Sequence, residues 1–174
     1  EQIVHLAEDP GTRLLSLTGP GGTGKTRLSI QAAAQMAAAQ DHLFPDGAWF
    51  VPLANVQSLT GLIQAIAKGL SFSFYQEEKS PRRQLMDYLR QKRMLLVLDN
   101  FEQLVESCRE LVVEVLEAAP GVKLLITSRQ RLNSRSRLAA ATNLARWSSA
   151  PLPVLVLVPH WAMPSAVLVA RSSR

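Results

Sequence analysis

The feature that most constrains this chain is a glycine-rich segment close to its first residue, residues 19–26, which read Gly-Pro-Gly-Gly-Thr-Gly-Lys-Thr. It follows a short apolar run and leads into an alanine-rich stretch of strong helix formers. The segment fits the pattern G-x-x-x-x-G-K-[ST], which connects a strand to a helix. Its glycines let the backbone curve around phosphate oxygens, and the helix that follows adds its positive N-terminal end. The sequence therefore predicts a loop that binds the phosphates of a nucleotide.

Within this loop, the polar side chains have separate expected tasks. The ammonium group of Lys25 is expected to contact the β- and γ-phosphates, and the hydroxyl of Thr26 is expected to bind Mg²⁺. The expected cofactors are therefore ATP or ADP together with Mg²⁺. The residues predicted to bind the nucleotide are Gly19, Pro20, Gly21, Gly22, Thr23, Gly24, Lys25, Thr26 and Arg27.

A second apolar run, residues 94–98, ends at Asp99. A continuous apolar run of this length is typical of a strand that is buried on both faces of a parallel sheet. A carboxylate at the carboxyl end of such a strand faces the crevice where ligands bind, so Asp99 is expected to hold Mg²⁺ opposite Thr26. The alternative is an aspartate that only caps the next helix.

A third apolar run, residues 124–126, delivers Thr127, Ser128 and Arg129 to the same edge of the predicted sheet. A guanidinium group binds phosphate oxygens through two parallel hydrogen bonds, so Arg129 is predicted to sense a γ-phosphate. The alternative is a solvated arginine in a surface loop, since Arg131 lies two residues further on.

The residues after Asp99 bear on hydrolysis. A fast ATPase of this kind usually carries a glutamate directly after the aspartate to orient the attacking water, whereas this chain has Asn100, a poor general base. Glu102 falls on the first turn of a predicted helix, residues 102–118, where a carboxylate also complements the helix dipole. We therefore expect nucleotide binding with slow turnover. The candidate catalytic residues are Lys25, Asp99, Asn100, Glu102 and Arg129.

The predicted elements alternate between helix and strand along residues 1–132. That alternation predicts an α/β fold in three layers, with a mostly parallel sheet and helices on both faces. Pro52 favours an edge position for the strand at residues 48–53. Ser58 and Ser80 are predicted helix N-caps. Expected helices cover residues 1–9, 25–39, 59–70, 82–91 and 102–118, and expected strands cover residues 14–18, 48–53, 94–98 and 123–127.

Composition separates the chain into two parts. All 14 acidic residues and 14 of the 19 basic residues lie in residues 1–131, whereas residues 133–174 contain five arginines, no acidic residue and no glycine. We predict that residues 1–132 form the nucleotide-binding domain and that residues 133–174 are a tail foreign to the fold, either disordered or translated out of frame. Four prolines and His160 argue against a membrane span in the tail, and its scattered arginines argue against a nucleic-acid-binding arm.

The cysteine content and the first residues bear on the cellular compartment. Cys108 is the one cysteine of the chain, which excludes an internal disulfide and agrees with a reducing compartment. The chain starts at Glu1 without the basic and apolar regions of a signal peptide. We therefore expect a cytoplasmic location and a piece of a longer polypeptide. One cysteine and three dispersed histidines offer no zinc-binding spacing.

Taken together, these motifs resemble the NB-ARC branch of the STAND class of P-loop NTPases. The resemblance is to the bacterial regulators, LuxR-type or similar, that join such a domain to TPR repeats and a DNA-binding domain. It covers residues 1–132, and it is specific in the combination of its motifs rather than in any single one. The matching segments are residues 19–28, 44–53, 95–102 and 124–129.

The resemblance implies a regulatory module that binds ATP or ADP, hydrolyses ATP slowly and acts as a nucleotide-gated switch in signalling or transcription. It places the strand before Arg129 between the strands that lead to the phosphate loop and to Asp99. It also implies helical, winged-helix and TPR domains on the same polypeptide and an oligomer that forms with ATP, without direct nucleic-acid or membrane contact by this domain. The adenine-binding segment of the family would lie ahead of Glu1, and the role of its ADP-binding histidine is not carried over to His160.

Two other classes of protein stay open at this point. A DNA-acting motor of the AAA+ or RecA type is disfavoured, because residues 1–131 carry no net charge and no basic stripe. A small-molecule kinase or other phosphotransferase would need a lid with basic residues. The candidates for such a lid are Arg82, Arg83, Arg90, Lys92 and Arg93.

Overall fold

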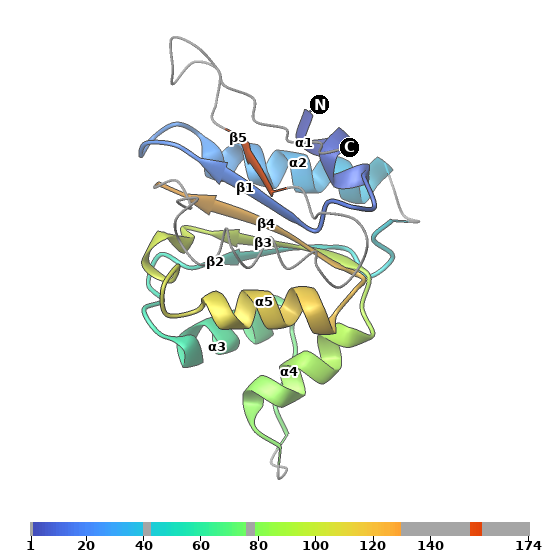
Figure 1. Ribbon diagram of the computed structural model, residues 1–174, viewed down its shortest axis with the longest axis vertical. Coiled ribbons are helices and arrows are strands. Elements are labelled where there is room, and N and C mark those ends of the chain that lie inside the picture. Colours follow the sequence, from blue (N-terminus) through green and yellow to red (C-terminus); the bar gives the residue numbers. More distant parts are fainter. Residues whose placement is uncertain (1, 40–42, 76–78, 130–153, 158–174) are drawn as a thin grey trace.

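The computed structural model describes residues 2–39, 43–75, 79–129 and 154–157. In this part of the chain, helices cover both faces of one sheet, which gives three layers and confirms the predicted fold class (Figure 1). The helices are α1 (Gln2–Glu8), α2 (Lys25–Ala39), α3 (Leu59–Gly69), α4 (Pro81–Arg90), the 3-10 helix η1 (Phe101–Gln103) and α5 (Arg109–Ala118). The strands are β1 (Leu14–Thr18), β2 (Ala48–Pro52), β3 (Met94–Asp99), β4 (Val122–Ser128) and β5 (Val154–Leu157).

All strand pairs of this sheet are parallel, and the strand order is β2-β3-β4-β1-β5. β4 lies between β1 and β3, with Leu124 opposite both Leu14 and Leu96. The strand of the predicted γ-phosphate sensor is therefore flanked by the strand of the phosphate loop and the strand of the predicted metal ligand, as expected. β2 lies at an edge, as Pro52 predicted, because a proline cannot donate a hydrogen bond to a second neighbour.

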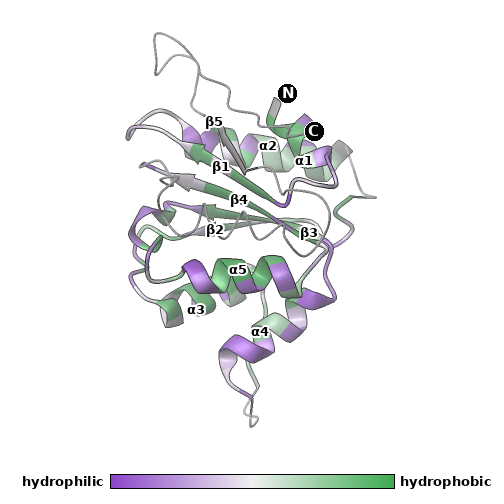
Figure 2. Ribbon diagram, in the orientation of Figure 1, coloured by the Kyte–Doolittle hydropathy of each residue, from purple (hydrophilic) through white to green (hydrophobic). Residues whose placement is uncertain are grey.

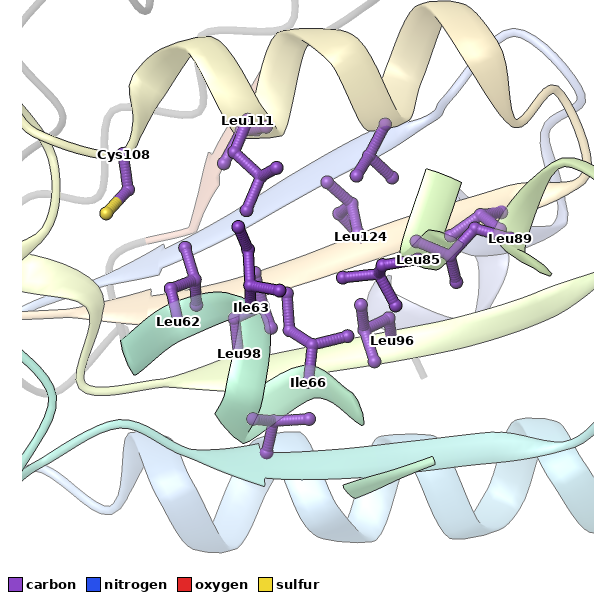
Figure 3. Packing of buried hydrophobic residues seen from close by; sticks show 14 of the residues in the cluster. Leu62, Ile63, Ile66, Leu85, Leu89, Leu96, Leu98, Cys108, Leu111 and Leu124 are labelled. Atoms are coloured by element: carbon purple, nitrogen blue, oxygen red, sulfur yellow. The ribbon is translucent and has the colours of Figure 1, made fainter. Parts of the chain in front are cut away.

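The two faces of β3 explain why its sequence is apolar over residues 94–98. Leu95 and Val97 pack into the core under α1 and α2, whereas Leu96 and Leu98 pack into the larger core shared with α3, α4 and α5. The central strands are largely hydrophobic, whereas the helices carry both hydrophobic and hydrophilic residues (Figure 2). The buried apolar residues of the helices pack into the two cores, although two large apolar residues of α2 stay exposed. In the larger core, leucine and isoleucine side chains from the three helices meet those of the strands (Figure 3). A central strand between two such cores leaves no position for a solvent-facing residue.

Two helices begin where serine N-caps were predicted. The Ser58 hydroxyl accepts the N–H of Gly61 at 3.1 Å. The Ser80 hydroxyl accepts the N–H of Arg83 at 3.4 Å, and Pro81 occupies the first helical position. Each bond satisfies an N–H group that has no partner within its own helix. Both predicted caps are confirmed.

The predicted helix over residues 102–118 is wrong at its beginning. The chain first forms η1 and then turns, and α5 begins at Arg109. Asn100 adopts the left-handed conformation, with φ 64°, and turns the chain off the end of β3. Phe101 and Leu104 are fully buried after this turn, so their burial takes precedence over an early helix start. Cys108, directly before α5, is buried in the larger core as well.

β5 belongs to the segment that the sequence assigned to a foreign tail. It pairs in parallel with β1, with Leu14 opposite Val154, and the sequence did not predict it. The arginines, the prolines and His160 of this segment lie outside the described residues. The foreign-tail hypothesis therefore stays a prediction, which the coding DNA across Asn133 can test. None of the helices in the described ranges is long and apolar enough to cross a membrane.

Asp46 joins the turn before β2 to the segment before β3. Its carboxylate accepts Lys92 Nζ at 2.9 Å through Oδ1 and the N–H of Arg93 at 2.8 Å through Oδ2. The N–H of Asp46 in turn donates to the carbonyl of Arg93 at 3.1 Å. The backbone hydrogen bond from Arg93, followed by the bond from Lys92, holds the pKa of the Asp46 carboxyl below its ordinary value. The folded state therefore favours the charged carboxylate.

Asp46→Asn is expected to lower the free energy of unfolding by about 1 kcal/mol at pH 7, because the amide has no charge and only one acceptor oxygen, so it cannot keep both bonds at this partly exposed site. A carboxyl whose pKa is lowered by folding stabilises the fold above its unfolded pKa and loses that effect as the pH falls through its folded pKa. The difference between the two proteins should therefore shrink below about pH 4. Urea unfolding at pH 7 and at pH 3 measures it, with Glu106→Gln at an exposed residue as the control. An equal difference at both pH values would contradict the prediction.

Candidate functional site

The phosphate loop connects β1 to α2 at the carboxyl end of the sheet. Gly22 and Gly24 both have φ 76°, in the left-handed region that glycine adopts without the steric cost of a side chain. A Cβ atom at either glycine would meet nothing within 4 Å, so the constraint on these positions is conformational. The N–H of Gly19 donates to the carbonyl of Ser128 at 3.3 Å, which ties the start of the loop to the end of β4.

Lys25 curls back over the loop that precedes it. Its Nζ donates to the carbonyl oxygens of Gly19 and Pro20, each at 2.7 Å, and to the Thr23 hydroxyl at 3.3 Å. The Thr23 hydroxyl donates in turn to the carbonyl of Pro20 at 2.9 Å. The three protons of the ammonium group thus have acceptors in the loop, and its positive charge is held where a phosphate group would be expected to approach.

Asp99 connects the first turn of α2 to the ends of β3 and β4. The Thr26 hydroxyl donates to Asp99 Oδ1 at 2.9 Å and to Oδ2 at 3.1 Å. The Thr127 hydroxyl donates to Asp99 Oδ1 at 2.6 Å, and it accepts the N–H of Asn100 at 3.0 Å. Asp99 is only 7% exposed, so these bonds fix an almost buried carboxylate. Sequence reasoning placed Thr127 at this edge of the sheet but did not identify it as the residue that orients Asp99.

Arg129 follows β4 directly and contacts Glu102 of η1. The Nε atom of Arg129 is 3.1 Å from Glu102 Oε1, and the N–H of Arg129 donates to Glu102 Oε2 at 3.4 Å. Glu102 therefore does not lie on the first turn of the helix that contains Val112 and Val115, where the sequence predicted it. It lies instead beside the arginine that was predicted to sense the nucleotide.

An open cleft of about 870 Å³ lies against the phosphate loop. The charged residues that line it are Lys25, Arg27 and Arg129, all cationic, which favours a polyanionic ligand. Ile30 and Gln31 also line the cleft, and sequence reasoning missed them. They follow Arg27 by three and four residues on α2, a spacing that places side chains on the same helix face. The other lining residues are Gly21, Gly22, Thr23, Gly24, Thr26 and Asn100.

Comparison with known protein families agrees with this geometry. The family model described as the NB-ARC domain matches residues 1–142. The chain belongs to the NB-ARC domain family. The matched range extends past residue 132, where the sequence predicted that the nucleotide-binding domain ends.

Two curated relatives of this NB-ARC domain come from Mycobacterium tuberculosis and Mycobacterium bovis. Each is named as a proposed HTH-type transcriptional regulator, and each is 40% identical to this chain over 118 residues. The match covers 68% of this chain and 13% of the relative, so the chain spans a small part of the length of these proteins.

Solved structures of P-loop ATPases resemble this NB-ARC domain in fold. The ORC2 protein of Aeropyrum pernix, in its ADPNP and ADP complexes, matches with a TM-score of 0.60 at 14% identity, over 90% of this chain and 44% of that chain. Domain III of the replication initiation protein DnaA from Thermotoga maritima matches with a TM-score of 0.52 at 16% identity, over 80% of this chain and 55% of that chain. These identities show the fold alone. Family and fold together support a nucleotide-binding module with the fold of P-loop ATPases.

Proposed function

We propose that this NB-ARC domain is a nucleotide-gated switch that binds ATP or ADP with Mg²⁺ and hydrolyses ATP slowly. One observation carries the proposal. Thr26 and Asp99 are hydrogen-bonded to each other at the phosphate loop, and Arg129, which follows β4, lines the cleft together with Thr26. The site therefore combines a phosphate-binding loop, a pair of oxygen ligands and a separate cation that can distinguish one phosphate chain length from another.

The oxygen atoms of Thr26 and Asp99 fit Mg²⁺. This ion prefers hard oxygen ligands and is usually held by one or two protein side chains, with phosphates and waters as its other ligands. Within the described part of the chain, no three His, Cys, Asp or Glu side chains are grouped to hold a metal ion, which agrees with a site that nucleotide phosphates complete. When bound, the ion would neutralise charge that develops on the phosphate oxygens.

Slow turnover is expected from the residues that follow Asp99. Asn100 carries an amide, which does not accept a proton from water at neutral pH. Glu102, the next carboxylate along the chain, is paired with Arg129 rather than free to act as a base. A slow ATPase suits a switch, because the bound ATP then persists long enough to report a state to the rest of the protein.

Arg129→Ala is expected to weaken ATP binding by about tenfold and to leave ADP binding within about twofold, because only ATP carries the γ-phosphate. Titration of the purified chain with each nucleotide measures both affinities, and the same preparation should hydrolyse fewer than about one ATP per second. Arg83→Ala is the matched control, since it removes an exposed arginine from α4. An equal loss of ATP and ADP affinity would contradict the sensor role, and many turnovers per second would contradict the switch.

The names of the relatives support a role in transcriptional control. Two of them are named as proposed HTH-type regulators, and this chain matches only 13% of their length. We therefore assign DNA contact and output to other domains of a longer polypeptide, and nucleotide sensing to this one. A cytoplasmic location would follow from that role.

A further inference from the structure

Glu102 holds Arg129 at two places with one carboxylate. Oε1 pairs with the side-chain Nε at 3.1 Å, and Oε2 accepts the backbone N–H at 3.4 Å. The Glu102 side chain is 14% exposed, whereas the Arg129 side chain is 65% exposed. A carboxylate that is largely shielded from water attracts a cation more strongly than an exposed carboxylate does. The pair is therefore suited to hold a long side chain that would otherwise sample many conformations in solvent.

Glu102 contacts the Arg129 guanidinium at its Nε atom. An arginine side chain has five N–H donors on three nitrogens, and the pair with Glu102 is made by Nε. This is the one ion pair of the Arg129 guanidinium in the described part of the chain. Arg129 lines the cleft, whereas Glu102 is absent from the described residues that line it. The contact is thus at the Nε edge of the guanidinium, and within the described residues no hydrogen bond joins the two terminal nitrogens to Glu102.

Hydrogen bonds and burial on both sides of Glu102 hold its backbone in place. Asn100, in the left-handed conformation, donates its N–H to Thr127 Oγ1 at 3.0 Å. Phe101 is fully buried, and its carbonyl accepts the N–H of Leu104 at 2.9 Å. Glu102 thus lies between Asn100, which is hydrogen-bonded to β4, and the turn that the Phe101–Leu104 hydrogen bond closes. A carboxylate on a backbone that is held in this way can fix the orientation of the more exposed Arg129 side chain.

We propose that Glu102 is a positioning residue that presents the terminal nitrogens of Arg129 to the γ-phosphate and so increases the preference for ATP over ADP. The inference rests on the proposed function, because it assumes that Arg129 contacts the γ-phosphate. Its physical basis is preorganisation: a side chain that is already ordered loses less entropy when the ligand binds. The opposite effect, in which Glu102 competes with the phosphate for Arg129, would change ATP affinity in the other direction.

Glu102→Ala is expected to weaken ATP binding by about threefold to tenfold and to leave ADP binding within about twofold. Glu102→Gln keeps oxygen and loses charge, so its ATP affinity should lie between those of Glu102→Ala and the unchanged chain. Glu106→Ala is the matched control, because it removes an exposed glutamate four residues away with the same change in charge. The readout is the ratio of ATP to ADP affinity in titrations of the 174-residue chain, which a general loosening of the fold would not change.

Combination with Arg129→Ala separates this inference from the function on which it rests. If Glu102 acts through Arg129, the double variant should bind ATP no more weakly than Arg129→Ala alone. Tighter ATP binding by Glu102→Ala, an unchanged ATP-to-ADP ratio, or additive losses in the double variant would overturn the positioning role while the sensor role stands. An unchanged ratio in Arg129→Ala would instead show that the sensor role itself is wrong. Should Glu102→Ala fail to fold, Glu102→Gln alone decides by the same ratio.

Discussion

Lys25→Ala is expected to weaken the binding of both ATP and ADP by about a hundredfold. The ammonium group already lies against the carbonyl oxygens of Gly19 and Pro20, from which it can transfer to phosphate oxygens. Hydrogen bonds to charged groups contribute about 1.5–3 kcal/mol each, and about 1.4 kcal/mol corresponds to a tenfold change in affinity. Loss of one or two such bonds therefore accounts for the expected effect. ADP is affected as well, because it keeps the β-phosphate.

A fluorescent-nucleotide titration, followed by competition with ATP and with ADP, measures this loss. Lys68→Ala is the matched control, because it removes an exposed lysine of α3 with the same change in charge. The thermal midpoint of Lys25→Ala should be compared with that of the unchanged chain, since the ammonium group also holds the loop together. A change in both affinities of less than about threefold would show that the loop is not the main phosphate-binding element.

Phe101→Ala is expected to lower the free energy of unfolding by about 3–5 kcal/mol. The Phe101 ring is 0% exposed and belongs to the larger core, which it enters from the end of β3. Its removal leaves a cavity in the larger core, and this backbone has little freedom to fill it because Asn100 is bonded to Thr127. A loss of this size is a large part of the stability of an ordinary domain.

Urea unfolding followed by circular dichroism measures the effect of Phe101→Ala. Tyr75→Ala is the matched control, because it removes an aromatic ring that is 69% exposed. This control should change the free energy of unfolding by less than about 0.5 kcal/mol. Similar losses from both substitutions would contradict the assignment of Phe101 to the core.

Features set by short-range chemistry could be predicted from the sequence. The hydroxyls of Ser58 and Ser80 cap the helices that follow them, because an N-cap needs only the three or four residues after it. Pro52 restricted β2 to an edge through the missing N–H alone. Met94 to Leu98 formed a central strand because a continuous apolar run has to be covered on both faces. Each of these predictions depended on one residue type or one local pattern.

Features that depend on contacts between distant segments could not be predicted in this way. Glu102 and Arg129 are far apart in sequence, and only the adjacency of β3 and β4 brings them together. The left-handed backbone of Asn100 has no signature beyond the tolerance of asparagine for that region, and it moved the start of α5 to Arg109. β5 was missed because a strand of four residues carries a weak pattern on its own.

Asn100 also limits how a general base could be introduced at the position after Asp99. Asparagine, aspartate and glycine enter the left-handed region readily, whereas most other residues are disfavoured there by about 1–2 kcal/mol. A glutamate introduced as a general base would have to accept that strain or straighten the chain. Straightening would change the backbone directly before Phe101, which is fully buried. A general base at this position would therefore carry a cost in folding stability, which a rebuilt junction between strand and helix could remove and one exchanged side chain could not.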